Sequence, residues 1–204
     1  MPLEIINNRN DSDIRKSELQ IISFVSQNEF ESWMEENNSL TEGIWVRFYK
    51  KNSFVISINY QEALDVALCY GWIDGQVKKY DELSYLQKFT PRRTKSMWSK
   101  RNKEHIARLN QENRMKPRGL KEVENAKSDG RWERAYDSPG NMTVPEDFML
   151  KLTTNKKAFE FFESLNKTNK YSIGWRLQTA PSKEIREKRI NEIVMMMENG
   201  EKFH

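Results

Sequence analysis

Apolar residues recur at two spacings along the chain, and the shorter spacing predicts a small sheet. In GIWVRFYKK (43–51), Ile44, Val46 and Phe48 alternate with other side chains, which is the two-residue period of a strand. The stretch GQVKKYDELSYLQKFTPRR (75–93) alternates as well, and predicts a hairpin that turns near Asp81 and ends at Pro91. The apolar, partly β-branched stretch LQIISFVS (19–26) predicts a further short strand.

The longer spacing predicts helices, several of which have recognisable ends. Ser26 is a helix cap for a segment that reaches about Glu36. Asn59 and Glu62 form a capping box for YQEALDVALCYG (60–71), with Gly71 as the left-handed residue after the helix. Ser96 or Ser99 caps SKRNKEHIARLNQEN. A short helix follows in GLKEVENAKSDG, and further helices are expected over 144–152, 156–166, 169–178 and 181–199.

The order of these elements predicts an α+β fold, with a small antiparallel sheet packed by helices and an all-helical C-terminal subdomain. Residues 137–145 (DSPGNMTVP) are rich in Pro, Gly, Asn and Ser, which is typical of a linker. Thr143 and Glu146 are expected to form a second capping box there. We therefore expect a flexible tail over 1–18, an α+β core domain over 19–138 and a helical subdomain over 139–204.

Charge and cysteine content exclude several classes of protein. The net charge is +4, yet residues 76–121 alone hold 14 Lys or Arg against 4 Asp or Glu. Such a segment suits a polyanion-binding face or a merely solvated surface. One cysteine and two histidines exclude a disulfide framework and a cysteine-based zinc site, so no metal or cofactor is expected. No apolar stretch reaches the length of a membrane span, and we expect a cytoplasmic protein.

The stretch CYGWIDGQ (69–76) is the first candidate for chemistry. Between Gly71 and Gly75, Trp72 and Asp74 are expected to lie in a short loop next to Tyr70. A carboxylate beside an aromatic wall can act as an acid or base, whereas the structural alternative is an Asx turn or an ion pair with a nearby arginine. Cys69, late in an apolar helix, is expected to be buried and inert.

The stretch FTPRRTKSMWSKRN (89–102) is the second candidate. Arginines and the free amides at a helix start favour an anion, and an indole can stack on a ring. The alternative is a capped helix with a core tryptophan and two structural arginines. The candidate side chains here are Arg92, Arg93, Ser96, Trp98, Ser99 and Asn102. His105, further along the predicted helix, is expected on the surface.

Four stretches together resemble a known family: YQEALDVALCYGWIDGQ, FTPRRTKSMWSKRN, AKSDGRW and TAPSKEIREKRINEIVMMMENG. They are similar to the YdeI/OmpD-associated proteins, also called bacteriocin-protection proteins, from about Phe24 to Gly200. The resemblance implies a bacterial, cytoplasmic protein linked to tolerance of bacteriocins or antimicrobial peptides. It supplies no catalytic residues, although both candidate stretches match the family's recurrent motifs.

Three functions remain open at this point. The first is binding of a small anionic or aromatic ligand in one groove lined by both candidate stretches. The second is binding of nucleic acid by the basic face of 76–121. The third is a hydrolase or transferase reaction that uses Asp74 with Ser96 or Ser99, although no motif in the chain specifies a reaction.

Overall fold

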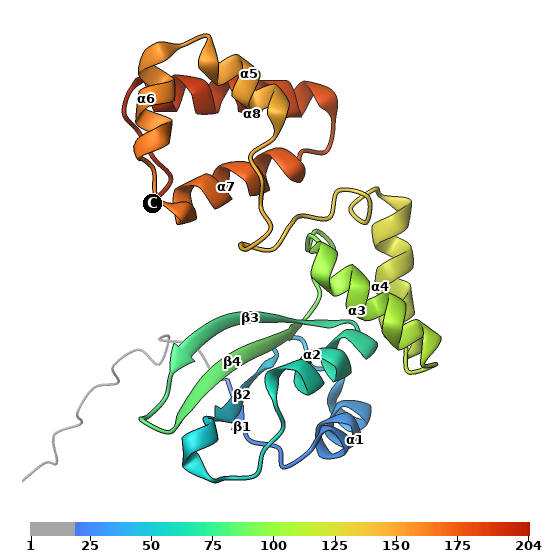
Figure 1. Ribbon diagram of the computed structural model, residues 1–204. Coiled ribbons are helices and arrows are strands. Elements are labelled where there is room, and N and C mark those ends of the chain that lie inside the picture. Colours follow the sequence, from blue (N-terminus) through green and yellow to red (C-terminus); the bar gives the residue numbers. More distant parts are fainter. Residues whose placement is uncertain (1–18) are drawn as a thin grey trace, which may run out of the picture.

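A computed structural model describes residues 19–204 (Figure 1), and the tail expected over 1–18 lies outside these residues. In this part of the chain, four strands form one sheet in the order β1-β2-β4-β3. They are β1 (Ile21–Ile22), β2 (Ile44–Tyr49), β3 (Trp72–Lys79) and β4 (Ser84–Pro91). The pairs β2–β4 and β3–β4 are antiparallel, whereas the two-residue β1 pairs with β2 in parallel. The sheet is thus antiparallel except at this edge.

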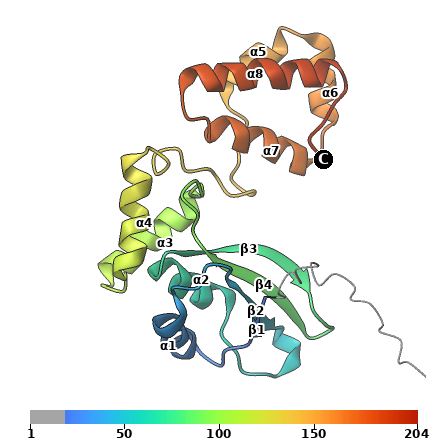
Figure 2. The ribbon, with the colours of Figure 1, turned by 180° about the vertical axis from the view of Figure 1, so that it is seen from behind.

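Within residues 19–204, eight α-helices cover and follow the sheet. They are α1 (Gln27–Asn37), α2 (Tyr60–Cys69), α3 (Lys100–Gln111), α4 (Pro117–Ser128), α5 (Glu146–Thr153), α6 (Lys156–Ser164), α7 (Lys167–Gln178) and α8 (Lys183–Glu198), with a short 3-10 turn, η1, at Lys51–Ser53. Figures 1 and 2 show α1 and α2 against one face of the sheet and α5 to α8 grouped apart from it. The predicted α+β fold with a helical C-terminal part is confirmed.

The hydrophobic residues form two separate clusters. The first joins the sheet to α1–α4 and contains residues between Phe24 and Ala135, because the inward faces of β2 and β4 are covered by apolar side chains of α1 and α2. The second lies among α5–α8 and is centred on Phe148, Phe162 and Met197. The connecting segment is held by Asp137, whose backbone N–H donates to the Gln178 side chain at 2.9 Å.

Local signals placed most helix ends correctly. Ser26 caps α1, and the box formed by Asn59 and Glu62 opens α2 as predicted. Gly71 follows α2 with φ of +74°, the left-handed conformation that glycine adopts most cheaply. Of the two candidate caps for α3, Ser99 is the one used, and its hydroxyl accepts from the Asn102 N–H.

Three local predictions were wrong. The strand expected over 19–26 is reduced to β1, because only Ile21 and Ile22 pair with β2. Trp72 to Asp74 are not a loop but the first residues of β3, and Gly75 lies inside that strand beside a bulge. The helix α5 has no side-chain cap, since Pro145 stands at the cap position instead of Thr143. Across residues 19–204, none of the helices is both long and apolar enough to cross a bilayer.

Candidate functional site

The two candidate stretches meet at one end of the sheet. Trp72 stands opposite Pro91 in the β3–β4 pair, and the Arg92 N–H donates to the Gly71 carbonyl at 3.0 Å. Strand pairing therefore brings residues 19 positions apart into contact. Their side chains nevertheless point into different surroundings, and this divides the predicted groove.

The aromatic members of the two stretches belong to the core. Trp72 is fully buried, lies edge-on to Trp33 with centroids 6.2 Å apart, and donates from Nε1 to the Asn38 carbonyl at 3.3 Å. Trp98 is buried against Trp132. Tyr70 is buried too, and its hydroxyl donates to Glu35 at 3.2 Å. In these positions neither indole lines a pocket, and the walls of any binding site must come from other side chains.

Arg92 is a buried cation without a carboxylate partner among the described residues. Its guanidinium lies 3.4 Å from the centre of the Trp98 ring, and Nη1 donates only to the Met97 carbonyl at 3.4 Å. Nε and Nη2 have no acceptor within the described part of the chain. Burial lowers the pKa of Arg92 to about 9, which still leaves the group charged at neutral pH.

We expect Arg92→Met to leave the free energy of unfolding unchanged or to raise it by about 1 kcal/mol. Burying a charge without an ion partner costs more free energy than burying an apolar side chain of similar length. The Met side chain also keeps the packing on Trp98. Urea denaturation at neutral pH measures the effect. Arg131→Met is the matched control, because Arg131 is equally buried but is paired with Asp129 at 2.7 Å, and its loss should be destabilising. A loss in Arg92→Met as large as that in Arg131→Met would contradict the prediction.

Arg93 and Ser96 form a turn after β4. The Ser96 hydroxyl accepts from the Arg93 N–H at 3.0 Å, and the Ser96 carbonyl accepts from Arg131 at 2.8 Å. Arg92 and Arg93 line an open cavity of about 500 Å³ together with Lys88 and Arg118, and Asp74 is not part of its wall. The single groove expected from the sequence is thus two separate cavities.

A second, smaller cavity of about 320 Å³ lies where the sheet, the start of α3 and the C-terminal helices come together. We call it the junction pocket. Three predicted site residues line it: Asp74 on β3, and Ser99 and Asn102 at the start of α3. The rest of the wall comes from the same two elements and from three further segments, with Tyr60, Ile73, Gly75, Arg101, Tyr136, Ser138, Pro139 and Tyr171.

The junction pocket presents hydrogen-bonding groups of opposite character. The Asp74 carboxylate accepts from the Tyr60 hydroxyl at 2.8 Å, and Arg101 lies 5.6 Å from the centre of the Tyr60 ring. Burial, then the Asp74 charge, raises the pKa of Tyr60 and of Tyr136. Burial also raises the pKa of Tyr171. All three phenols therefore stay protonated at neutral pH and can donate a hydrogen bond.

Two family models match the chain on either side of this pocket. Residues 141–200 match the family described as Bacteriocin-protection, YdeI or OmpD-Associated. The C-terminal part of the chain is a YdeI/OmpD-associated domain. Residues 22–122 match a different model, described as a domain of unknown function (DUF8412). No curated protein and no solved structure matches the chain.

These matches limit the resemblance expected from Phe24 to Gly200. Both candidate stretches fall within residues 22–122 and thus outside the YdeI/OmpD-associated domain. That domain contributes Tyr171 to the junction pocket, whereas Tyr60, Asp74 and Arg101 come from the other matched segment. Tyr136 belongs to neither, because it lies between the two matches.

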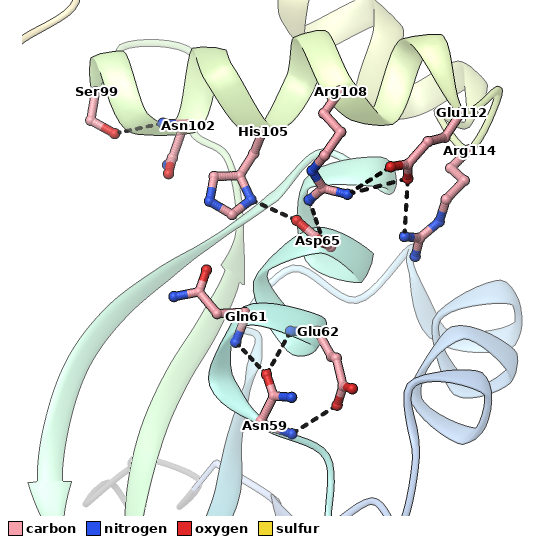
Figure 3. A network of polar contacts seen from close by, with 10 residues as sticks. All are labelled: Asn59, Gln61, Glu62, Asp65, Ser99, Asn102, His105, Arg108, Glu112 and Arg114. Carbon is pink, nitrogen blue, oxygen red and sulfur yellow. Dashed lines mark hydrogen bonds and ion pairs between the residues drawn. The ribbon is translucent and has the colours of Figure 1, made fainter.

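Outside the pocket, His105 is not the surface residue that was expected. Its Nδ1 lies 2.6 Å from Asp65 on α2, and both side chains are largely buried. Asp65 also accepts a hydrogen bond from Arg108, and Arg108 donates a further hydrogen bond to Glu112, as Figure 3 shows. The network fastens α3 to α2, which places the start of α3 beside β3 and so forms one wall of the junction pocket.

The basic segment is more neutralised than its composition indicates. Five of its cations form ion pairs with acidic residues: Lys79, Lys100, Arg108, Arg114 and Lys116. Arg92 is buried, and Lys78 packs over the Trp45 ring at 4.4 Å. Residues 19–204 contain no cluster of His, Cys, Asp and Glu suited to a metal ion.

Sequence reasoning missed the three tyrosines and the arginine of the pocket. Tyr60 and Arg101 lie in the first turns of helices whose caps, Asn59 and Ser99, are recognisable in the sequence, and these caps are the local signal for both positions. Tyr136 lies just before the linker and Tyr171 lies on α7, and neither has a local pattern that points to β3. Backbone hydrogen bonds with Trp98 and Lys100 bring Tyr136 there, and the docking of α7 brings Tyr171.

Proposed function

We propose that the protein binds a small organic ligand with an anionic group and a flat aromatic body in the junction pocket. The observation that carries this proposal is the convergence of Arg101, Asp74 and three tyrosines, drawn from both parts of the chain, on one concave site. Binding sites commonly combine such walls with a few convergent polar groups.

The proposal assigns a role to each wall. Arg101 and the amides at the start of α3 receive the anionic group, since helix dipole and guanidinium act in the same direction there. The rings of Tyr60, Tyr136 and Tyr171 pack against the flat body. Asp74 accepts a hydrogen bond from a donor on the ligand, which selects against ligands that carry only acceptors.

The other two functions receive less support. Nucleic-acid binding draws its affinity from cations that contact phosphates, and five of the fourteen cations in the basic segment already pair with carboxylates. Catalysis by Asp74 with a serine requires a free hydroxyl, but Ser99 and Ser96 both accept hydrogen bonds from backbone amides as structural caps. The family description of the C-terminal domain names bacteriocin protection, and we propose that binding of the ligand in the cytoplasm serves that process.

We expect Arg101→Gln to weaken the binding of small aromatic anions about tenfold, because a charge-assisted hydrogen bond is lost. Hydroxybenzoate and phenyl phosphate are suitable probes, first in a thermal-shift screen and then by titration calorimetry. Arg93→Gln is the matched control, since it removes the same charge from an exposed residue of the other cavity.

The comparison of the two variants decides the proposal. Equal weakening in both would indicate general attraction to a basic surface and would reject the junction pocket. The same conclusion follows if Arg101→Gln binds every hit of the screen as tightly as the unaltered protein does.

A further inference from the structure

A further cavity, of about 390 Å³, lies between α7 and α8, close to the junction pocket. We call it the α7–α8 cavity. Its wall consists of Met97, Trp175, Arg176, Thr179, Arg189, Glu192, Ile193, Met196 and Phe203. Trp175 stands one helical turn after Tyr171 of the junction pocket and packs on Tyr136 with centroids 6.1 Å apart. The two cavities are therefore neighbours along α7.

Most of this wall is apolar. Its apolar side chains include Trp175 on α7 and Ile193 and Met196 on α8, together with Phe203 after α8. Met97 is the one wall residue from the sheet-containing part of the chain, and its carbonyl accepts the hydrogen bond from Arg92. An apolar surface of this kind is suited to a ring or a short hydrocarbon chain.

Two arginines in the wall lack carboxylate partners among residues 19–204. Arg176 lies 3.8 Å from the centre of the Phe203 ring and donates to the Ser172 carbonyl at 3.3 Å. Arg189 donates to the Arg176 carbonyl at 2.5 Å. Burial, then the neighbouring Arg189 charge, lowers the pKa of Arg176. Each guanidinium is thus bonded only to neutral carbonyl groups, and the two repel one another.

The neighbouring Arg186, on the same helix as Arg189, has the carboxylate partner that Arg176 and Arg189 lack among the residues that the structure describes. It forms two hydrogen bonds of 2.7 Å with the Asp147 carboxylate and so needs no further partner. The only acidic residue in the wall of the α7–α8 cavity is Glu192, whose carboxylate is 3.8 Å from Lys188. The cavity keeps an excess of positive charge beside an apolar surface.

We propose that the α7–α8 cavity binds an organic anion with an apolar body, of the aryl-alkyl carboxylate class. The carboxylate lies between Arg176 and Arg189, whose forked donors match its two oxygens. The ring or chain lies against Trp175, Ile193 and Met196. Because Met97 completes the wall, the occupant also contacts the residue that connects to Arg92, and so joins the C-terminal helices to the sheet-containing part.

The test uses phenylbutyrate as the probe and its neutral amide, phenylbutyramide, as the matched ligand without charge. Binding is measured by titration of protein labelled with ¹³C at the methionine methyl groups. We expect phenylbutyrate to shift the signals of Met97 and Met196, and to leave that of Met34, which is buried in the first core, unchanged. The amide is expected to bind roughly tenfold more weakly.

Variants on α8 connect the probe to the arginines. Arg189→Gln should weaken phenylbutyrate binding about tenfold and leave amide binding unchanged. Lys183→Gln is the control, because it removes the same charge from an exposed residue of the same helix outside the cavity. Arg101→Gln should leave this binding unchanged, so that a failure here is separate from a failure at the junction pocket.

Three results would overturn the proposal. The first is the absence of any shift at Met97 and Met196 with millimolar phenylbutyrate. The second is equal affinity for the acid and the amide. The third is equal weakening by Arg189→Gln and Lys183→Gln, which would show that only the overall charge of the helix matters.

Discussion

Replacing Trp72 with Ala is expected to lower the free energy of unfolding by about 4 kcal/mol. The indole is fully buried and packs edge-on against Trp33, and its Nε1–H donates a hydrogen bond to the Asn38 carbonyl. Its removal leaves a cavity under β3, and the Asn38 carbonyl loses one hydrogen-bond donor. Urea denaturation followed by far-UV circular dichroism measures the loss.

Trp45→Ala is the control for this prediction. Trp45 stands on β2 of the same sheet, is only partly buried and packs against the Lys78 ammonium group. The same chemical change there should cost clearly less, because solvent fills the space that the ring leaves. If Trp72→Ala cost no more than Trp45→Ala, Trp72 would not be the core residue described above, and a role in ligand binding would return.

Gly119→Ala is expected to lower the free energy of unfolding by about 3 kcal/mol. A Cβ at this position would lie 2.2 Å from the Cys69 carbonyl oxygen and 2.8 Å from that of Leu68. Both are backbone atoms that no rotamer change can move, so α4 must lift away from the end of α2. The gain of about 1 kcal/mol in helix propensity from Gly to Ala does not offset this overlap.

Gly140→Ala provides the comparison, because a Cβ there would meet nothing within 4 Å. This exposed linker position should change the unfolding free energy by less than about 0.5 kcal/mol. Parallel urea curves for the two variants report the difference. Equal midpoints would mean that α4 does not lie as closely on α2 as the distances above require.

The parts of the fold that depend on local pattern were predictable from the sequence. Alternation placed β2, and the capping box at Asn59 placed α2, since both depend on residues a few positions apart. Trp72–Asp74 was misassigned to a loop because the two flanking glycines have different roles. Gly71 adopts a left-handed conformation after α2, whereas Gly75 continues an extended strand.

The site was predictable only in part, for the same reason. Sequence reasoning selected Asp74, Ser99 and Asn102, which do line one pocket, and it also selected both tryptophans, which are core residues. The spacing of residues in the sequence does not distinguish a core tryptophan from one that lines a binding site. Tyr171, across the pocket from Asp74, is placed by how α7 docks, and that contact has no short-range signal in the chain.

The close seating of α4 over the end of α2 has a practical consequence for Cys69. This lone thiol is buried, and burial raises its pKa to about 11, so at neutral pH it is shielded from alkylating reagents both sterically and chemically. A maleimide can therefore react only during moments when the helices separate. The rate of maleimide labelling at Cys69 therefore measures how often α2 and α4 separate, without any engineered probe.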